Sequence, residues 1–222
     1  MNQTIDLLSI SDGKKYKIGD KVKADAMGCE GCFACCHDVG NLVTLTPKDI
    51  WEMRRALNLD SESLFQSYVE LKVEHKLPIP YLKMKPSNQN CVFLNDVEEC
   101  SIHANRPDIC RLFPLARVYE GDDYYYILQK NACVKPKLEY VSVSKWLGIE
   151  AYPDHKAFIL SWHNLLTALR FRLKFVRDDK TLNELNRIFM ESFYYIPLTL
   201  EGDFYSYFNM NLKKNKDKLG IL

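Results

Sequence analysis

Residues 28–38 read GCEGCFACCHD, a stretch that places four cysteines within eight residues. These cysteines follow a C-x-x-C-x-x-C-C spacing and are Cys29, Cys32, Cys35 and Cys36. A C-x-x-C step lets two sulfur atoms reach one metal centre across a tight turn, and Gly28 and Gly31 give the backbone the freedom that such a turn needs. We therefore expect this stretch to hold a metal and the rest of the fold to be arranged around it.

The chain has four further cysteines, Cys91, Cys100, Cys110 and Cys133. The N-terminus lacks the basic and apolar regions of a signal peptide, and the uncharged apolar stretch 157–169 is too short to cross a bilayer. We therefore expect a cytoplasmic protein without membrane association. Clustered cysteines in a reducing compartment usually bind metal, because disulfides are rare there. All eight cysteines are predicted metal ligands.

Cys35 and Cys36 are adjacent, an arrangement that a single zinc site does not require. Neighbouring side chains in extended backbone point to opposite faces, so this pair would serve two centres, or one polynuclear centre approached from two sides. The pair therefore favours an iron–sulfur centre such as a 4Fe–4S cluster, with zinc as the alternative. Eight thiols suit two four-cysteine sites or one cluster with spare cysteines.

Two arginines, Arg106 and Arg111, lie on either side of Cys110 in the sequence. Four thiolates on a zinc ion, or on an oxidised four-iron cluster, carry a formal charge of about minus two, which nearby cations would offset. Each arginine could donate to thiolate sulfur, and Arg111 could also hold an anionic group such as a substrate or methyl-donor carboxylate. We predict both as cofactor-binding residues, with ordinary surface ion pairing as the alternative.

The histidines are weaker candidates than the cysteines. His37 and His103 lie close to cysteines in the sequence, and either could complete a mixed site. Because eight cysteines already fill two four-ligand sites, hydrogen bonding beside the centre is the simpler interpretation. We expect His155 in the core or at the surface. No GxGxxG, phosphate-binding loop or Ser/His/Asp arrangement is visible, so no catalytic residue is predicted.

The composition is that of an ordinary globular protein, with 47% hydrophobic and 27% charged residues among 222. The net charge of +1 creates no field that would attract nucleic acid, so nucleic acid is not an expected partner. We predict an α+β fold in three parts that form one compact domain. The parts are an N-terminal extension (1–27), an irregular cysteine-cluster metal-binding region with short strands (28–136) and a helical region packed on it (137–222).

Turn signals and hydrophobic spacing place a few regular elements along the chain. Thr46 followed by Pro47 predicts a helix over 47–57, and a second helix is expected over 62–73. Strands 115–119 and 124–128 should form a hairpin around the turn EGDD. Short extended pieces are expected at 42–45, 81–84, 91–94 and 100–103. Three helices are predicted at 153–176, 181–194 and 203–212, the last with aromatic residues that pack the core.

The motifs occur in the order C-x-x-C-x-x-C-C, LTPKD, CVFL, CSIHANRPDICRLFP and a final cysteine. In this order and spacing, the chain resembles the YkgJ-type cysteine-cluster family of zinc- or iron-chelating proteins, which is related to flagellin lysine N-methylases. The resemblance implies that the eight cysteines are the pool of metal ligands. It also implies that one segment belongs to the same site, namely Arg106, Pro107, Cys110, Arg111, Phe113 and Pro114. Where the family often has tyrosine, this chain has His103, so a ligand role for that histidine does not follow.

Three functions remain open. The favoured one is a metal-binding protein that holds an iron–sulfur or zinc centre and works with a redox partner. The second is an S-adenosylmethionine-dependent protein lysine N-methylase resembling the flagellin methylases, although those are usually longer and no methyl-donor loop is recognisable here. The third is a zinc-stapled interaction module without catalysis, for which a closed all-cysteine site is typical.

Overall fold

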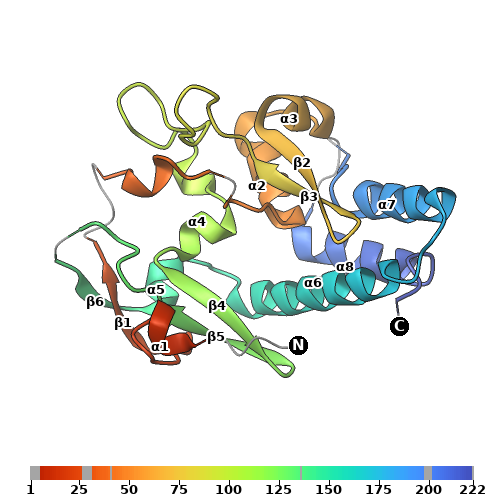
Figure 1. Ribbon diagram of the computed structural model, residues 1–222. Coiled ribbons are helices and arrows are strands. Elements are labelled where there is room, and N and C mark those ends of the chain that lie inside the picture. Colours follow the sequence, from red (N-terminus) through yellow and green to blue (C-terminus); the bar gives the residue numbers. More distant parts are fainter. Residues whose placement is uncertain (1–5, 27–31, 41, 136, 198–201, 222) are drawn as a thin grey trace.

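The structure is a computed structural model that describes residues 6–26, 32–40, 42–135, 137–197 and 202–221. Helices alternate with short antiparallel strand pairs, which confirms the predicted α+β class. In Figure 1 the long C-terminal helices lie on one side of the molecule and the loops that carry the cysteines on the other. The short helix α4 (Asp108–Leu112) lies between these two parts.

The strands of the described ranges form separate two-stranded antiparallel sheets. The pairs are β1 (Lys21–Asp25) with β6 (Glu139–Ser142), β2 (Val69–Glu74) with β3 (Leu77–Leu82), and β4 (Leu115–Glu120) with β5 (Asp123–Leu128). The β4–β5 hairpin confirms the predicted one, and its turn contains Gly121 at φ +60°, a conformation that glycine adopts readily. An isolated strand pair is marginally stable in water, so each sheet depends on packing against its surroundings.

The helix α2 (Pro47–Leu57) begins where the sequence predicts. The Thr46 side chain accepts a hydrogen bond from the Asp49 amide, and the Asp49 carboxylate accepts one from the Thr46 amide at 2.7 Å. These two bonds form a capping box, which fixes the start of the helix. Ile50 and Met53 are fully buried, so the apolar face of α2 anchors it to the core.

The predicted helix over 62–73 is wrong in its second half. The helix α3 (Ser61–Tyr68) ends directly before β2, which pairs with β3 from Val69 opposite Leu82 onward. A continued helix would have placed Leu71 on its apolar face, yet this side chain is 46% exposed. Backbone pairing in the hairpin therefore outweighs the helical spacing of the apolar residues.

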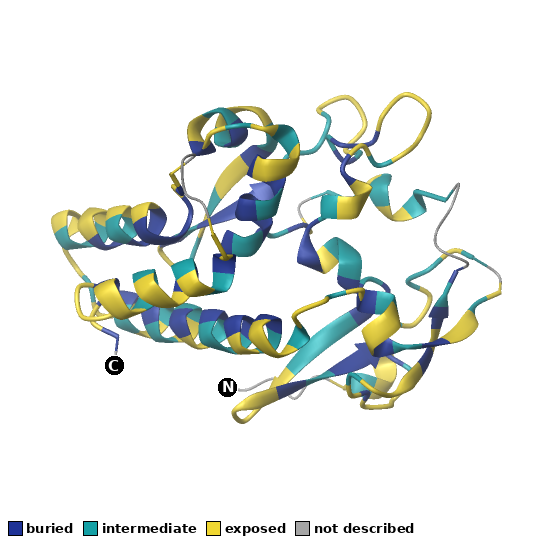
Figure 2. Ribbon diagram, turned by 180° about the vertical axis from the view of Figure 1, so that it is seen from behind, coloured by how far each residue is buried: buried dark blue, intermediate teal, exposed yellow. Residues whose placement is uncertain are grey.

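The C-terminal helices are α5 (Val143–Leu147), α6 (Tyr152–Leu173), α7 (Asp179–Phe193) and α8 (Phe204–Asn215). The last three confirm the three predicted helices to within a few residues at each end. Their aromatic rings pack together, with Trp162 5.7 Å from Phe189 and 6.2 Å from Phe208 between ring centroids. Figure 2 shows buried residues (dark blue) along these helices, which form the apolar core of this part.

The N-terminal segment joins the rest through backbone pairing that the sequence did not reveal. It contains the short helix α1 (Leu7–Ile10) and strand β1, which pairs with β6. Tyr16 and Tyr126 exchange two backbone hydrogen bonds of 2.8 Å, which attach the segment to β5 as well. Because β6 lies within 137–222, the region interpreted as helical also contributes a strand.

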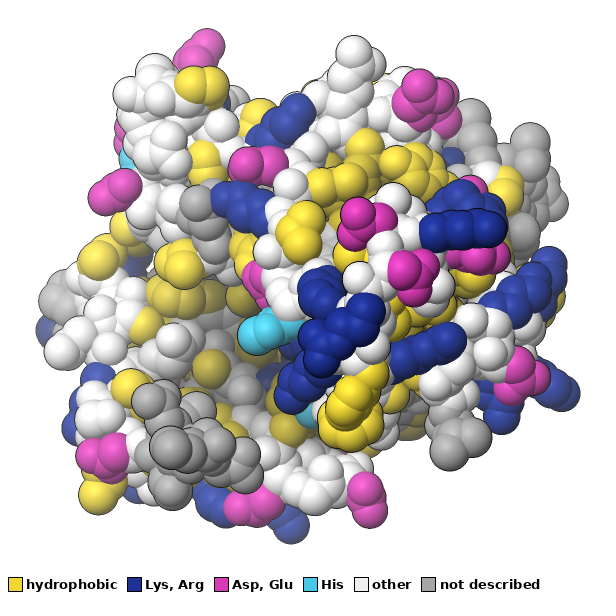
Figure 3. All heavy atoms as spheres, turned by 45° about the vertical axis from the view of Figure 1, so that its right-hand side comes forward, with side chains coloured by type: hydrophobic (Ala, Val, Ile, Leu, Met, Phe, Trp, Pro, Cys, Tyr) yellow, Lys and Arg dark blue, Asp and Glu magenta, His cyan; other side chains and the backbone are white. Residues whose placement is uncertain are grey.

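Charges of both signs are mixed on the surface. On the face in Figure 3, basic side chains (dark blue) are interspersed with acidic ones (magenta), and one group of basic side chains lies near the centre of the view. Among the residues that the structure describes, no helix is long and apolar enough to cross a membrane.

Candidate metal centre

Seven of the eight predicted ligands fall within the described residues, and Cys29 lies outside them. All seven are free thiols, carried by loops and by two short helices, η2 (Ala34–Cys36) and α4. Cys91 is buried, Cys35 is exposed, and the remaining five are half-buried. The thiols therefore lie where the chain has little regular structure.

Backbone hydrogen bonds bring the first cysteine motif to the second. The Cys91 amide donates to the Cys36 carbonyl at 2.8 Å. The Leu94 amide closes a turn onto the Cys91 carbonyl at 3.0 Å, and Leu94 in turn lies opposite Cys100 in an isolated bridge. These contacts gather three cysteines that are far apart in the sequence.

The Cys36 thiol is a hydrogen-bond donor between two other cysteines. Its hydrogen bonds lower the pKa of Cys35 and that of Cys91 to about 7, and they hold the pKa of Cys36 well above its usual value. The Phe93 and Leu94 amides also donate to the Cys91 sulfur. Thiolate is the metal-binding form of cysteine, and donors to sulfur are common around thiolate-bound metals. The surroundings of Cys35 and Cys91 therefore favour the metal-binding form.

Burial raises the pKa of Cys100 and of Cys110, and the nearby Cys91 and Cys35 raise both further. These thiols therefore influence one another's ionisation and lie in one region of the molecule. We call them the five-thiol group: Cys35, Cys36, Cys91, Cys100 and Cys110. Sulfur atoms that repel one another when ionised are stabilised by a bound cation, so this group suits a metal.

Cys35 also belongs to a second set of thiols. With Cys32 and Cys133 it lines a cavity of about 80 Å³, which we call the three-thiol cavity. Its other walls include Phe113 and Trp146, whose indole Nε1 donates to the Phe113 carbonyl at 3.2 Å. The cavity is larger than a single water molecule requires. The three-thiol cavity and the five-thiol group therefore adjoin at Cys35.

The adjacent cysteines do not lie in the extended backbone that the sequence interpretation assumed. η2 is a 3-10 helix, in which successive side chains diverge by about 120° rather than pointing to opposite faces. This divergence lets Cys36 reach Cys91 while Cys35 lines the three-thiol cavity. The two side chains therefore have different surroundings, as predicted, but they diverge because of the 3-10 helix and not because of extended backbone.

The two predicted arginines lie in different surroundings. Arg106 lowers the pKa of Cys35 and Cys100 through its positive charge, after larger effects of hydrogen bonding and burial. Arg111 donates to the Ala104 carbonyl at 2.8 Å, and its own pKa is lowered by burial and by Arg106. Arg106 therefore acts on the thiols, whereas the hydrogen bond of Arg111 goes to the backbone.

The histidines near the cysteines have polar partners other than thiols. His37 Nδ1 lies 3.2 Å from the Asn90 side-chain nitrogen, and His103 contacts the guanidinium of Arg106. These contacts agree with the interpretation of both as hydrogen-bonding neighbours. His155 lies in the core and is 2% exposed.

Within the described ranges, no group of three or more Cys, His, Asp or Glu side chains is arranged to hold a metal ion. The chemistry of the donor set nevertheless fits a thiolate-bound metal, because two adjoining sets of thiols have amide donors to sulfur and a guanidinium beside them. Metal binding releases thiol protons and is coupled to local folding, so ligation is expected to draw these thiols together.

Residues 28–134 match the model of the CxxCxxCC family, described as "Putative zinc- or iron-chelating domain". This segment is a CxxCxxCC domain. The match spans all eight cysteines, so it confirms the family expected from the motifs and supports the binding of zinc or iron. No curated protein and no solved structure matches the chain.

The CxxCxxCC domain also contributes to a buried charge network that sequence reasoning missed. Asp108 in α4 pairs with Arg117 at 2.5 Å and with His155 Nε2 at 3.1 Å, and its amide donates to the Asp49 carboxylate at 2.8 Å. Burial alone would raise the pKa of Asp108, but Arg117 and His155 hold it well below its usual value. No spacing in the sequence links these four side chains, which come from different parts of the chain.

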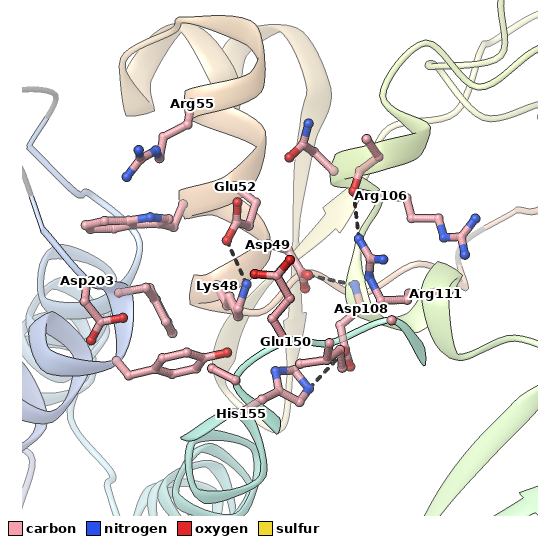
Figure 4. Close-up of a pocket in the computed structure, with 18 of the residues that line it drawn as sticks. Lys48, Asp49, Glu52, Arg55, Arg106, Asp108, Arg111, Glu150, His155 and Asp203 are labelled. Atoms are coloured by element: carbon pink, nitrogen blue, oxygen red, sulfur yellow. Dashed lines mark hydrogen bonds and ion pairs between the residues drawn. The ribbon is translucent and has the colours of Figure 1, made fainter. Parts of the chain in front are cut away.

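The network borders a cavity of about 510 Å³ (Figure 4). Both predicted cofactor-binding arginines, Arg106 and Arg111, line it. Asp108 and Arg111 of α4 face this cavity, whereas Cys110 between them interacts with the other thiols. The helix α4 therefore separates the cavity from the five-thiol group.

Proposed function

We propose that the CxxCxxCC domain holds an iron–sulfur centre, with its eight cysteines as the pool of ligands. The observation that carries this proposal is the position of Cys35, which belongs both to the five-thiol group and to the three-thiol cavity. A single zinc ion needs four ligands around one point and has no use for two adjoining sets of thiols. A polynuclear cluster, or two neighbouring centres, uses thiols that approach from two sides.

The surrounding residues support an electron-transfer role for such a centre. Amide donors to sulfur at Cys91 and Cys100, and the charge of Arg106, are the features that tune cluster potentials. The centre would supply one-electron chemistry, so we propose a redox partner and a reducing, cytoplasmic setting. The exposed Cys35 places one predicted ligand near solvent, where a partner could approach.

The test is anaerobic purification followed by analysis of iron, acid-labile sulfide and zinc on the same sample. We expect iron and sulfide in similar amounts, together with broad visible absorption that is lost on reduction. Zinc without sulfide would contradict the iron–sulfur proposal and favour the zinc-stapled interaction module.

A second candidate is an S-adenosylmethionine-dependent protein N-methylase, and one observation favours it. Arg106 and Arg111 line a cavity of about 510 Å³, which lies in the size range of small-molecule sites. Calorimetric titration with S-adenosylmethionine tests this candidate. Saturable binding that Arg111→Gln weakens would support it, and no heat at millimolar S-adenosylmethionine would contradict it.

A further inference from the structure

The strand β2 forms a free edge of the small sheet in the upper part of Figure 1. The other edge of this sheet, along β3, is covered by residues 43–45. There the Leu45 amide donates to the Pro80 carbonyl, and the Leu82 amide donates to the Val43 carbonyl, both at 2.9 Å. In the described part of the chain, β2 pairs with β3 and with no other strand. The outer side of β2 is therefore a place where a further strand can add.

The turn of the β2–β3 hairpin determines which residues of β2 bond to β3. Glu74 lies opposite Leu77, and the two residues between them have φ angles of +50° and +68°, as in a type I′ turn. The residues that flank such a turn exchange both backbone hydrogen bonds, and every second pair along the ladder does the same. Pro78 and Pro80, which have no N–H, lie in the pairs between, as this alternation requires.

The backbone groups of Val69, Leu71 and Val73 therefore point away from β3. The Val69 amide donates to the Phe65 carbonyl at the end of α3. The Val69 carbonyl and both backbone groups of Leu71 and Val73 have no hydrogen-bond partner among the described residues. The side chains of Leu71 and Val73 are 46% and 75% exposed. Free backbone groups beside exposed apolar side chains form a template for strand pairing.

The charged residues of β2 lie on its other face and alternate in sign, in the order Glu70, Lys72 and Glu74. Lys72 pairs with Glu70 at 3.5 Å, and Glu74 pairs with Arg170 at 3.1 Å. Charges at a free edge normally prevent strand addition, because like charges that lie directly opposite each other repel. Alternating signs remove this barrier in a register that sets each charge opposite one of the other sign.

We propose that β2 pairs antiparallel with β2 of a second copy of this chain, with the two-fold axis at Leu71. Each copy then donates two backbone hydrogen bonds, from Leu71 to the other Leu71 carbonyl and from Val73 to the Val69 carbonyl. These are the groups that are free in the single chain. The two Leu71 side chains meet at the axis, so the same surface serves both copies.

The charge pattern selects this register. With the axis at Leu71, Glu70 of each copy lies opposite Lys72 of the other, which is favourable. With the axis one residue further along, Lys72 would lie opposite Lys72 and Glu70 opposite Glu74, and both pairs would repel. Pairing over residues 69–73 buries less than the roughly 1,200 Å² of a standard interface, so the dimer should be weak and dependent on concentration.

The test is sedimentation of the metal-loaded full chain from micromolar to near-millimolar concentration, with a reductant present to prevent disulfides between chains. We expect monomers at the lower end and dimers at the upper end. Hydrogen exchange on the same samples should show the Leu71 and Val73 amides protected only at high concentration. A monomer at every concentration, or equal exchange of both amides throughout, would overturn the proposal.

Two matched variants locate the interface. Val73→Lys should weaken the dimer roughly tenfold, because each dimer loses two apolar cross-strand pairs and gains two lysines at the edge. The control is Val97→Lys, because Val97 is 73% exposed but lies in the loop 95–99, outside β2. Association that Val73→Lys leaves unchanged, or that both variants weaken equally, would overturn the assignment to β2.

Exchanging the charges tests the register. Glu70→Lys sets the introduced lysine opposite Lys72 and should weaken the dimer, whereas in the shifted register it would face Glu74 and strengthen association. The double variant Glu70→Lys/Lys72→Glu should restore the dimer, with a melting temperature that verifies its fold. Stronger association of Glu70→Lys, or no recovery in a folded double variant, would overturn the register. The inference does not depend on the metal centre, because β2 carries none of the predicted ligands.

Discussion

The helical region and the CxxCxxCC domain differ in what holds them together. In the helical region, α6, α7 and α8 interlock through apolar side chains, among which Phe189 and Leu173 are fully buried. In the CxxCxxCC domain, residues 86–89 and 95–99 are exposed, and only the short piece Cys91–Leu94 between them is largely buried (Figure 2). The continuous apolar core of the helices extends into the CxxCxxCC domain through α2, α3 and the two hairpins, whereas the loops at 86–100 are gathered around thiols.

This difference predicts two sources of stability. Burial of apolar surface stabilises the helices by roughly 25 cal/mol per Å². The loops at 86–100 bury too little apolar surface to be stabilised in this way. Bonds from sulfur to metal must therefore supply most of the free energy that stabilises them. Removing the metal should therefore mainly affect the loops at 86–100, and perturbing the aromatic core should mainly affect the helices.

Metal removal should have the largest effect. In zinc-finger peptides, structural metal contributes roughly 10 kcal/mol or more, so chelation should destabilise the cysteine-bearing loops of the CxxCxxCC domain by at least several kcal/mol. Hydrogen exchange should show lost protection in residues 86–110 while the amides of α6 remain protected. An unchanged melting temperature after complete metal removal would show that the loops are stable without metal.

The second prediction separates the two sets of thiols. Cys36→Ser removes a member of the five-thiol group, whereas Cys35→Ser removes the residue shared with the three-thiol cavity. We expect the two variants to lose different fractions of the bound metal and different parts of the visible spectrum. Metal analysis of both proteins decides this. Complete and identical loss from both would argue for one shared centre.

The third prediction tests the aromatic core. Phe189 is fully buried against Trp162, so Phe189→Ala should lower the free energy of unfolding by about 3–5 kcal/mol. The metal content per folded molecule should stay unchanged, because the substitution lies outside the CxxCxxCC domain. Urea denaturation and metal analysis on one preparation measure both quantities. Loss of metal from Phe189→Ala would show that the two regions are not stabilised separately.

The regular elements were predictable because their signals are local. The capping box at Thr46, the turn around Gly121 and the apolar spacing of α6 each depend on residues within a few turns of one another. The pairing of β1 with β6 was not predictable, because residues 21–25 contain nothing that specifies residues 139–142 as partners. The helix expected at 62–73 failed for the same reason, since its second half is determined by β3.

The family and the candidate residues of the site were also predictable from the sequence, but the way these residues meet in space was not. Cysteine spacing identified the family. Arg106 and Arg111 were predicted as cofactor-binding residues beside Cys110; the structure places both at a cavity that the sequence did not reveal, and their role stays a prediction. The network of Asp108, Arg117 and His155 left no trace in the sequence, because its members come from three elements that meet only in the folded chain. The ligand assignments of the individual cysteines stay predictions.

The last prediction has the smallest effect on stability and distinguishes two roles for Arg111. Arg111→Lys keeps the positive charge next to Cys110, so metal content and melting temperature should stay close to those of the unaltered protein. The variant loses the planar fork of donors, so S-adenosylmethionine binding, which tests the second candidate function, should weaken by roughly threefold to tenfold. Metal analysis, thermal unfolding and calorimetry on the two proteins side by side give the three readouts. If Arg111 only stabilised the thiolates, all three would match the unaltered protein, and the contrast between a metal-held domain and a separate ligand cavity would disappear.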